Sequence, residues 1–181
     1  MECQEIAATK RWLQDMVIGL NLCPFAKKPW QRKQIRFSIC TAAQEDHWFS
    51  ALAEELNFLL NATDTETTLL LLPALDRDFY RFLDVIDQAD FLIGEAKLRG
   101  EVQLAHFHPL YEFAGEAPEA CSHYTNRAPH AILHLIKEDS ITRVLDTYPD
   151  PESIPTNNMQ TMERLGLAKL KSLLNSYKTG A

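Results

Sequence analysis

The spacing of hydrophobic positions changes several times along the chain, and each change predicts an element. Apolar residues that share one helical face predict a helix over about residues 3–20. Alternating apolar and polar residues over 35–40 predict a half-buried strand, and the unbroken apolar run 69–72 predicts a strand covered on both faces. Similar patterns predict strands over residues 102–107 and 131–136.

Helical patterns lie between and after these strands. Thr41 and Gln44 form a capping-box signal for the second helix, and Asp76 is the expected cap of the third. A short helix is expected from residue 139 or 140 to about 148, and a last helix over about 156–177. Strands and helices alternate through the first three strands, which favours right-handed parallel crossovers.

The predicted fold class is α/β. We expect a single-domain layered sandwich over residues 1–181, with a mixed, mostly parallel sheet of about four strands flanked by helices. The sequence leaves the direction of the fourth strand open. A chain of 181 residues with 46% hydrophobic and 24% charged residues fits one domain with a sizeable core.

A long segment, residues 108–130, separates the third and fourth predicted strands and has neither a helical nor a strand period. Loops of this length inside a domain are usually functional or disordered. Disordered segments are poor in aromatic residues, whereas this one contains Tyr111, Phe113 and Tyr124. We therefore interpret it as an ordered, site-building loop over the carboxyl ends of the strands, where open parallel sheets bind ligands.

The polar residues of this loop predict a site for a small anionic molecule. Arg127 offers a planar guanidinium and Asn126 an amide, which suit carboxylate or phosphate, and Arg36 of the first strand is expected to join them. His108, whose backbone the following proline restricts, is the candidate catalytic acid or base, and Tyr111 is a second-rank ligand contact.

These residues also have a structural interpretation. His108 is equally suited to hold the loop through hydrogen bonds from a buried position. Arg127 is equally suited to staple the loop to a carboxylate such as Glu119 or Asp146, because arginine commonly forms such pairs.

Cys23 is the other candidate catalytic residue. A nucleophilic thiol needs a depressed pKa from a nearby cation, imidazole or helix N-terminus. Cys23 instead follows the C-terminus of the first predicted helix, where the dipole has the opposite sign. Core packing is therefore the preferred interpretation, and a His108 imidazole brought close by folding would reverse it.

Zinc is a further interpretation of the loop. His106, His108, Cys121 and His123 are residue types that zinc accepts as ligands. Their spacing matches the established zinc patterns only loosely. We therefore assign no metal and no other cofactor, and keep zinc as a secondary hypothesis.

Charge and composition limit the kinds of partner that the protein is expected to bind. The formal net charge of -7 argues against a broad nucleic-acid surface. The basic segment 27–36, which contains Trp30, is interpreted as a solvated connection in preference to a nucleic-acid patch. Because no long apolar run and no signal-peptide pattern is present, we expect no membrane segment, a cytoplasmic location and four free thiols.

Four segments carry a resemblance to a known family: Gly19–Ala26, Phe107–Pro109, Tyr124–Pro129 and Ile154–Asn158. With these segments the chain resembles a bacterial family catalogued as domain of unknown function 1415. The resemblance extends over most of the chain and implies a shared fold. It implies no established activity, cofactor or catalytic residue.

Two functions remain open from the sequence. The first is a small-molecule enzyme or ligand-binding domain that recognises an anionic ligand through the loop 106–130. The second is a non-catalytic protein interaction module anchored by Trp30, Tyr111 and Phe113. The sequence assigns neither an enzymatic reaction nor an oligomeric state.

Overall fold

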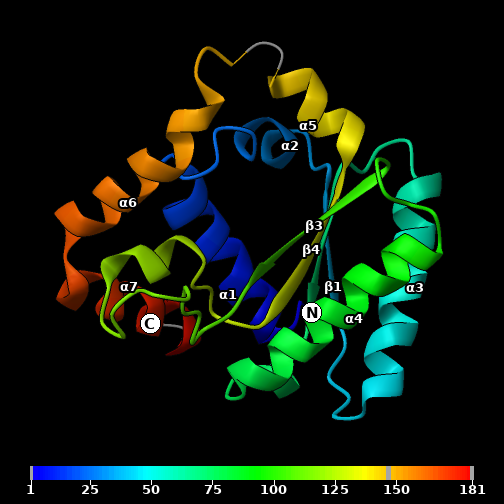
Figure 1. Cartoon of the computed structure of the whole chain (residues 1–181), viewed down its shortest axis with the longest axis horizontal. Helices are drawn as coiled ribbons and strands as arrows, with labels where there is room; N and C mark the ends of the chain where they lie inside the picture. The colour runs from blue at the N-terminus through cyan, green and yellow to red at the C-terminus, as the bar shows by residue number, and fades with distance from the viewer. Residues whose placement is uncertain (1, 146–147, 180–181) are drawn as a thin grey trace.

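A mixed sheet forms the centre of the molecule (Figure 1). In the computed structural model, which describes residues 2–145 and 148–179, this sheet has four strands. The strands are β1 (Ile35–Ile39), β2 (Thr67–Leu71), β3 (Val102–Phe107) and β4 (Ile132–Lys137). They lie in the order β1-β2-β4-β3, with β1 parallel to β2 and β4 antiparallel to both of its neighbours.

The predicted α/β class and the mixed sheet are confirmed. β1, β2 and β3 run in one direction, as the alternating elements predict, but β4 lies between β2 and β3 and runs the other way. The reason is that the segment 108–130 starts and ends at the same edge of the sheet, the edge where β3 ends and β4 begins. The sheet is therefore less parallel than expected.

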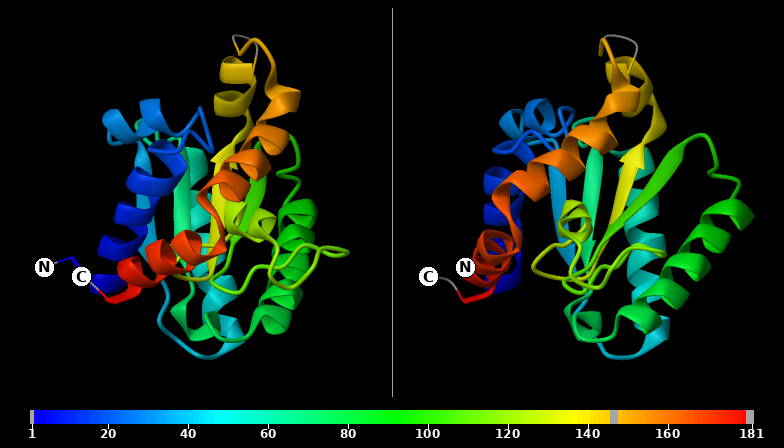
Figure 2. Two further views of the ribbon diagram at one scale, coloured as in Figure 1. Left: turned by 90° about the vertical axis from the view of Figure 1, so that its left-hand side faces the viewer. Right: turned by 60° about the vertical axis from the view of Figure 1, so that its left-hand side comes forward.

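Helices cover both faces of the sheet (Figure 2). The α-helices of the described part are α1 (Gln4–Trp12), α2 (Lys27–Gln31), α3 (Glu45–Asn61), α4 (Phe79–Glu95), α5 (Glu138–Leu145), α6 (Ile154–Leu165) and α7 (Leu167–Thr179). A π-helical segment, η1 (Leu13–Ile18), continues α1, and the 3-10 helices are η2 (Pro73–Leu75), η3 (Cys121–Thr125) and η4 (Pro151–Ser153). α3 and α4 lie on one face, and α1, α6 and α7 lie on the other.

Strand β2 shows why two cores form. Alternate side chains of a strand point to opposite faces, so Leu69 and Leu71 pack with Trp12 on one face while Leu70 packs with Phe82 on the other. All five residues are nearly or fully buried. The sequence prediction of a strand covered on both faces is confirmed.

Two helix starts differ from the prediction. Gln44 precedes α3 without a side-chain cap, so no capping box forms there. Asp78, and not Asp76, caps α4 by accepting a hydrogen bond from the Arg81 backbone N–H at 3.0 Å. Asp76 instead accepts from His130 at 2.7 Å, because the nearby strand end supplies a partner that sequence spacing does not show.

The two terminal helices are also more complex than their hydrophobic periods predict. The first predicted helix corresponds to α1 followed by η1. The last is split into α6 and α7 at Gly166, whose φ of 73° lies in the left-handed region that glycine adopts without steric cost. The basic segment, interpreted as a connection, contains the short helix α2. The predicted helix end near residue 148 follows positions 146–147, which lie outside the described residues.

Candidate functional site

The loop over the carboxyl ends of the strands is held by His108. The side chain is fully buried. Its Nε2–H donates to the Leu75 carbonyl at 2.9 Å, and Nδ1 accepts from the Leu110 backbone N–H at 3.0 Å. The Phe82 ring stacks on it at 5.1 Å, and burial lowers the pKa of the imidazole. Both nitrogens of His108 are thus engaged with the backbone in a neutral ring.

His123 repeats this arrangement within the loop. It is also fully buried. Nε2 donates to the Ala117 carbonyl at 2.8 Å, and Nδ1 accepts from the Phe113 backbone N–H at 3.1 Å. The two histidines therefore satisfy the Leu110 and Phe113 N–H groups of the loop, and each adds a bond to a carbonyl that also accepts a backbone N–H.

Asn126 and Arg127 also bind the loop to its surroundings. The Asn126 amide donates to the His106 carbonyl at 3.3 Å. Arg127 Nε donates to the Tyr111 carbonyl at 3.0 Å, and its guanidinium lies 4.7 Å from the centre of the Tyr124 ring. Arg127 is therefore a staple, but its partner is a carbonyl. Of the carboxylates considered from the sequence, Glu119 pairs with Lys171 at 3.2 Å, and Asp146 lies outside the described residues.

Arg36 does not join Arg127. The Arg36 guanidinium forms a bidentate pair with Glu55 of α3, at 2.6 and 3.0 Å, and lies 4.0 Å from the Phe58 ring centre. This places Arg36 on the α3 face, whereas Arg127 contacts Tyr124 in the core of the opposite face. We expected the two arginines to bind one anion together. That expectation is wrong, because the sheet lies between them.

Tyr111 is buried behind the loop and does not face solvent. Its side chain is 8% exposed, and its ring stacks against His106 at 5.6 Å. Burial raises the pKa of the Tyr111 hydroxyl.

A partly enclosed cavity of about 340 Å³ lies elsewhere, on the face of the sheet that carries α1. Side chains of the sheet, η1, α2 and α5 line it, and the wall is mainly apolar. The larger apolar side chains of the wall include Trp12, Leu13, Val17, Phe25, Phe107 and Ile141. Polar side chains at the wall are Cys23, Glu66, Thr67, Gln103, His134 and Ser140.

The cavity extends to the edge of the sheet opposite the one expected. Ile35, Thr67 and Gln103, at the amino ends of β1, β2 and β3, all line it. The carboxyl edge, where ligands of parallel sheets usually bind, is instead filled by the loop held through His108 and His123. The loop is ordered, as expected, and the cavity of about 340 Å³ lies toward the other edge of the sheet.

Cys23 reaches the cavity through the turn that follows η1. Glycine is required at Gly19, because a Cβ there would lie 2.3 Å from the Asp15 carbonyl oxygen. Burial raises the pKa of the Cys23 thiol, and it outweighs the backbone N–H groups of Phe25 and Ala26, which act to lower that pKa. Cys23 is therefore a thiol at neutral pH.

Cys23 and His108 do not meet. Cys23 packs with the core on the α1 face, whereas His108 contacts Phe79 and Phe82 of α4 on the other face. The imidazole at the same cavity as Cys23 belongs to His134.

His134 projects from the middle of β4, between Leu69 of β2 and Ala105 of β3. Its Nε2 lies 2.6 Å from Thr67 Oγ1, which is also 2.7 Å from the Leu135 carbonyl. Burial lowers the pKa of His134 to about 4, so the ring is neutral at pH 7. In the sequence His134 lies within the apolar run 131–136, a pattern typical of a residue in or next to the core, and nothing there indicates the cavity.

Helix α5 covers the cavity without filling it. Ile141 and Val144 lie at the wall, yet no residue of α5 is buried. The helix is held at its polar side, where Ser140 donates to Glu66 and Arg143 pairs with the same carboxylate at 2.9 Å. Ile141 and Val144, on the apolar side of α5, are thus half-buried at the wall of the cavity.

Comparison with known proteins places the chain in a family. The model of the family described as "Protein of unknown function (DUF1415)" matches residues 4–172. The chain belongs to the DUF1415 family. Neither a curated protein nor a solved structure matches this DUF1415 chain. In its described part, no helix is both long and apolar enough to cross a membrane.

The four segments that carried the DUF1415 resemblance come together in the fold. Asn158 of the last segment donates to the Leu22 carbonyl of the first at 2.7 Å. The His108 N–H donates to the Asn126 carbonyl at 3.1 Å and so joins the middle two. Two of the segments reach the cavity, because they supply Cys23 and Phe107 to its wall.

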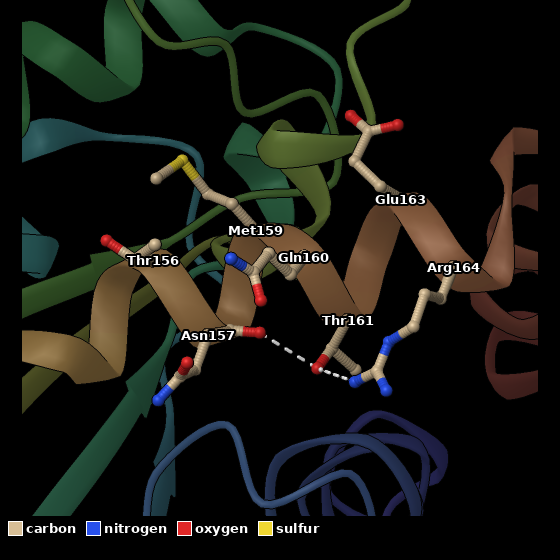
Figure 3. A pocket seen from close by; sticks show the side chains of 7 residues that line it. All are labelled: Thr156, Asn157, Met159, Gln160, Thr161, Glu163 and Arg164. Carbon is tan, nitrogen blue, oxygen red and sulfur yellow. Dashed lines mark hydrogen bonds between the residues drawn. The ribbon is translucent and has the colours of Figure 1, made fainter.

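Other parts of the DUF1415 chain offer weaker sites. A hollow along α6 is lined by Thr156, Asn157, Met159, Gln160, Thr161, Glu163 and Arg164 (Figure 3). All seven belong to one helix, so no second element encloses a ligand there. Among residues 2–145 and 148–179, no group of three or more His, Cys, Asp or Glu side chains is arranged to hold a metal ion.

Proposed function

We propose that this DUF1415 chain is a binding domain for a small, neutral organic molecule held in the cavity beneath α5. The observation that carries the proposal is the cavity itself: about 340 Å³, with a mainly apolar wall that contains Cys23 and His134. Ligand sites are typically cavities of roughly 300–1,000 Å³ with apolar walls and a few polar groups.

The charges at the wall favour a neutral ligand. Among the described residues that line the cavity there is no lysine or arginine, and the one carboxylate, Glu66, already binds Ser140 and Arg143. An anion moved from water into such a wall would lose its hydration without gaining a counter-charge. The anionic ligand predicted from Arg127 therefore stays a prediction for a separate site at the loop.

The interaction module is the weaker alternative. Of its expected anchors, Tyr111 is 8% exposed, and Trp30 and Phe113 are half-buried, with the Trp30 ring 6.4 Å from Phe37. An aromatic anchor must reach the partner to contribute at an interface.

A thermal-shift experiment with Ala105→Phe tests the proposal. Ala105 lines the cavity, so the added ring would occupy the ligand's space. At ten times its Kd, indole should raise the wild-type thermal midpoint by roughly 3–6 °C, because it binds the folded state alone. Ala105→Phe should show no shift.

The matched control is Ala53→Phe, on the exposed side of α3, which should respond as the wild type does. The proposal fails if neutral aromatic molecules leave the wild-type midpoint unchanged, or if Ala105→Phe responds as strongly as the wild type. A shift with phosphate or a small carboxylate that Arg127→Ala abolishes would instead support the loop site.

A further inference from the structure

We infer that the cavity selects ligands that carry an N–H or O–H donor, which the Nδ1 atom of His134 accepts. This inference rests on the proposed function and adds the chemical class of the ligand. It depends on which nitrogen of the His134 imidazole carries the proton and on whether the other nitrogen faces the cavity.

The hydrogen bonds around Thr67 assign the proton of His134. Thr67 Oγ1 has a single proton and lies 2.7 Å from the Leu135 carbonyl, which accepts hydrogen bonds and cannot donate them. With that proton directed at Leu135, Oγ1 accepts at its other contact, and His134 Nε2 is the donor at 2.6 Å. A neutral imidazole protonated at Nε2 has a lone pair at Nδ1.

The Nδ1 atom faces the cavity. No described residue bonds to it, and it is not among the polar atoms of the described part that are sealed in the interior without a partner. Because His134 lines the cavity and its strand neighbours pack on either side, the accessible space at Nδ1 is the cavity. A ligand donor is the group that would satisfy it.

The other polar groups of the wall are engaged, weak acceptors, or located at the amino edge of the sheet. Thr67 Oγ1 is engaged with His134 and Leu135, and the Glu66 carboxylate is paired through Oε2 with Ser140 and Arg143 of α5. Burial raises the pKa of the Cys23 thiol, so the sulfur keeps its proton and is only a weak acceptor.

Nδ1 of His134 lies in the middle of the sheet wall, between Leu69 and Ala105, whereas Glu66 and the exposed Gln103 lie at the amino edge of the sheet. A ligand donor that meets Nδ1 therefore fixes the orientation of the ligand against the apolar part of the wall.

The size and wall of the cavity limit the rest of the ligand. A cavity of about 150 Å³ with an apolar wall holds benzene, and this one is about 340 Å³. Trp12, Phe25 and Phe107 contribute aromatic rings to the wall. These features suit a neutral molecule of about two fused rings with one donor.

Indole and benzofuran form the test pair, because they have nearly the same shape and differ in the N–H donor. Isothermal titration should show that the wild type binds indole about tenfold more tightly than benzofuran, since benzofuran leaves Nδ1 without a partner. His134→Phe keeps a ring but removes the acceptor. The affinity of this variant for indole should therefore fall to its affinity for benzofuran.

The outcomes separate the two proposals. Equal wild-type affinities for indole and benzofuran would overturn the inference and leave the proposed function standing. Failure of both to bind would overturn both.

Two further measurements keep the inference testable if His134→Phe does not fold. Thr67→Val removes the acceptor that holds the proton on Nε2, so the preference for indole should shrink or reverse. Nitrogen-15 chemical shifts of His134 in the wild type should show Nδ1 unprotonated at pH 7, and a protonated Nδ1 would refute the assignment.

Discussion

His108 and His134 are both held inside the protein, yet their two rings differ in what their nitrogens do. His108 has both nitrogens bonded to backbone groups and a phenylalanine stacked on its ring. His134 has one nitrogen bonded to Thr67 and the other open to the cavity. A histidine in a polar loop thus proves to be an anchor, and one inside an apolar strand is available to a ligand.

The difference follows from the backbone around each residue. A strand satisfies its own N–H and C=O groups through the sheet, so the side chain of His134 is not needed for that purpose. An irregular loop leaves such groups unpaired, and leaving them unpaired in the interior is costly. His108 meets that need for the Leu110 N–H, and it adds a second bond to the Leu75 carbonyl, which also accepts from the Asp78 N–H at 2.9 Å.

The largest effect is expected at the anchor. His108→Ala should lower the free energy of unfolding by about 4 kcal/mol, because it removes two buried hydrogen bonds and a packed ring. Urea denaturation measures the loss. His47→Ala, at an exposed position of α3, is the control and should change stability by less than about 0.5 kcal/mol. A loss below about 1 kcal/mol at His108 would show that the ring is not an anchor.

The next effect is a pH dependence at His134. Its pKa is about 4 in the folded protein against an ordinary value of 6.5, so the unfolded chain takes up the proton first. Stability is therefore fully present above about pH 6.5 and falls as the pH drops toward 4. Between pH 7 and 4 the wild type should lose about 3 kcal/mol more than His134→Gln.

Urea denaturation across this range, with both proteins at each pH, gives the difference directly. Parallel curves for wild type and His134→Gln would mean that His134 is as accessible to protons as it is in the unfolded chain. That result would contradict the buried, neutral imidazole on which the comparison rests.

The smallest effect is expected at Arg127. Arg127→Met keeps the aliphatic stem but removes the bond to the Tyr111 carbonyl and the contact with the Tyr124 ring, at a cost of about 1 kcal/mol in the free energy of unfolding. Indole affinity, measured by titration, should remain within about twofold of wild type. A large loss of affinity would connect the loop to the cavity and weaken the contrast between the two sheet edges.

Most of the fold could be predicted from local patterns. The spacing of apolar residues predicted the strands and the long helices, because a strand or helix that is buried on one face places its apolar residues at a characteristic interval. The insertion of β4 between β2 and β3 could not be predicted this way, because the pattern of a covered strand is the same in either direction. The split at Gly166 depends on one left-handed residue, which a hydrophobic period does not register.

The candidate site was harder to predict than the fold. Cys23 stood out in the sequence because it follows a helix in a tight segment, and it does reach the cavity. His134 did not stand out, since its importance comes from the space beside it and the bond to Thr67, both created by contacts distant in sequence. Arg36 and Arg127 looked alike as anion ligands because sequence does not reveal on which face of the sheet each side chain ends.

The position of β4 has a consequence for how the chain folds. β3 pairs in the described sheet with β4, which is some thirty residues further along, and is not a hydrogen-bonded neighbour of β2, which precedes it. As the chain leaves the ribosome, β1 and β2 can pair at once, but β3 must wait for the loop and β4 before it has a hydrogen-bonding neighbour. Such non-local pairing slows folding, and the wall that contains His134 is complete only after the last strand has been added.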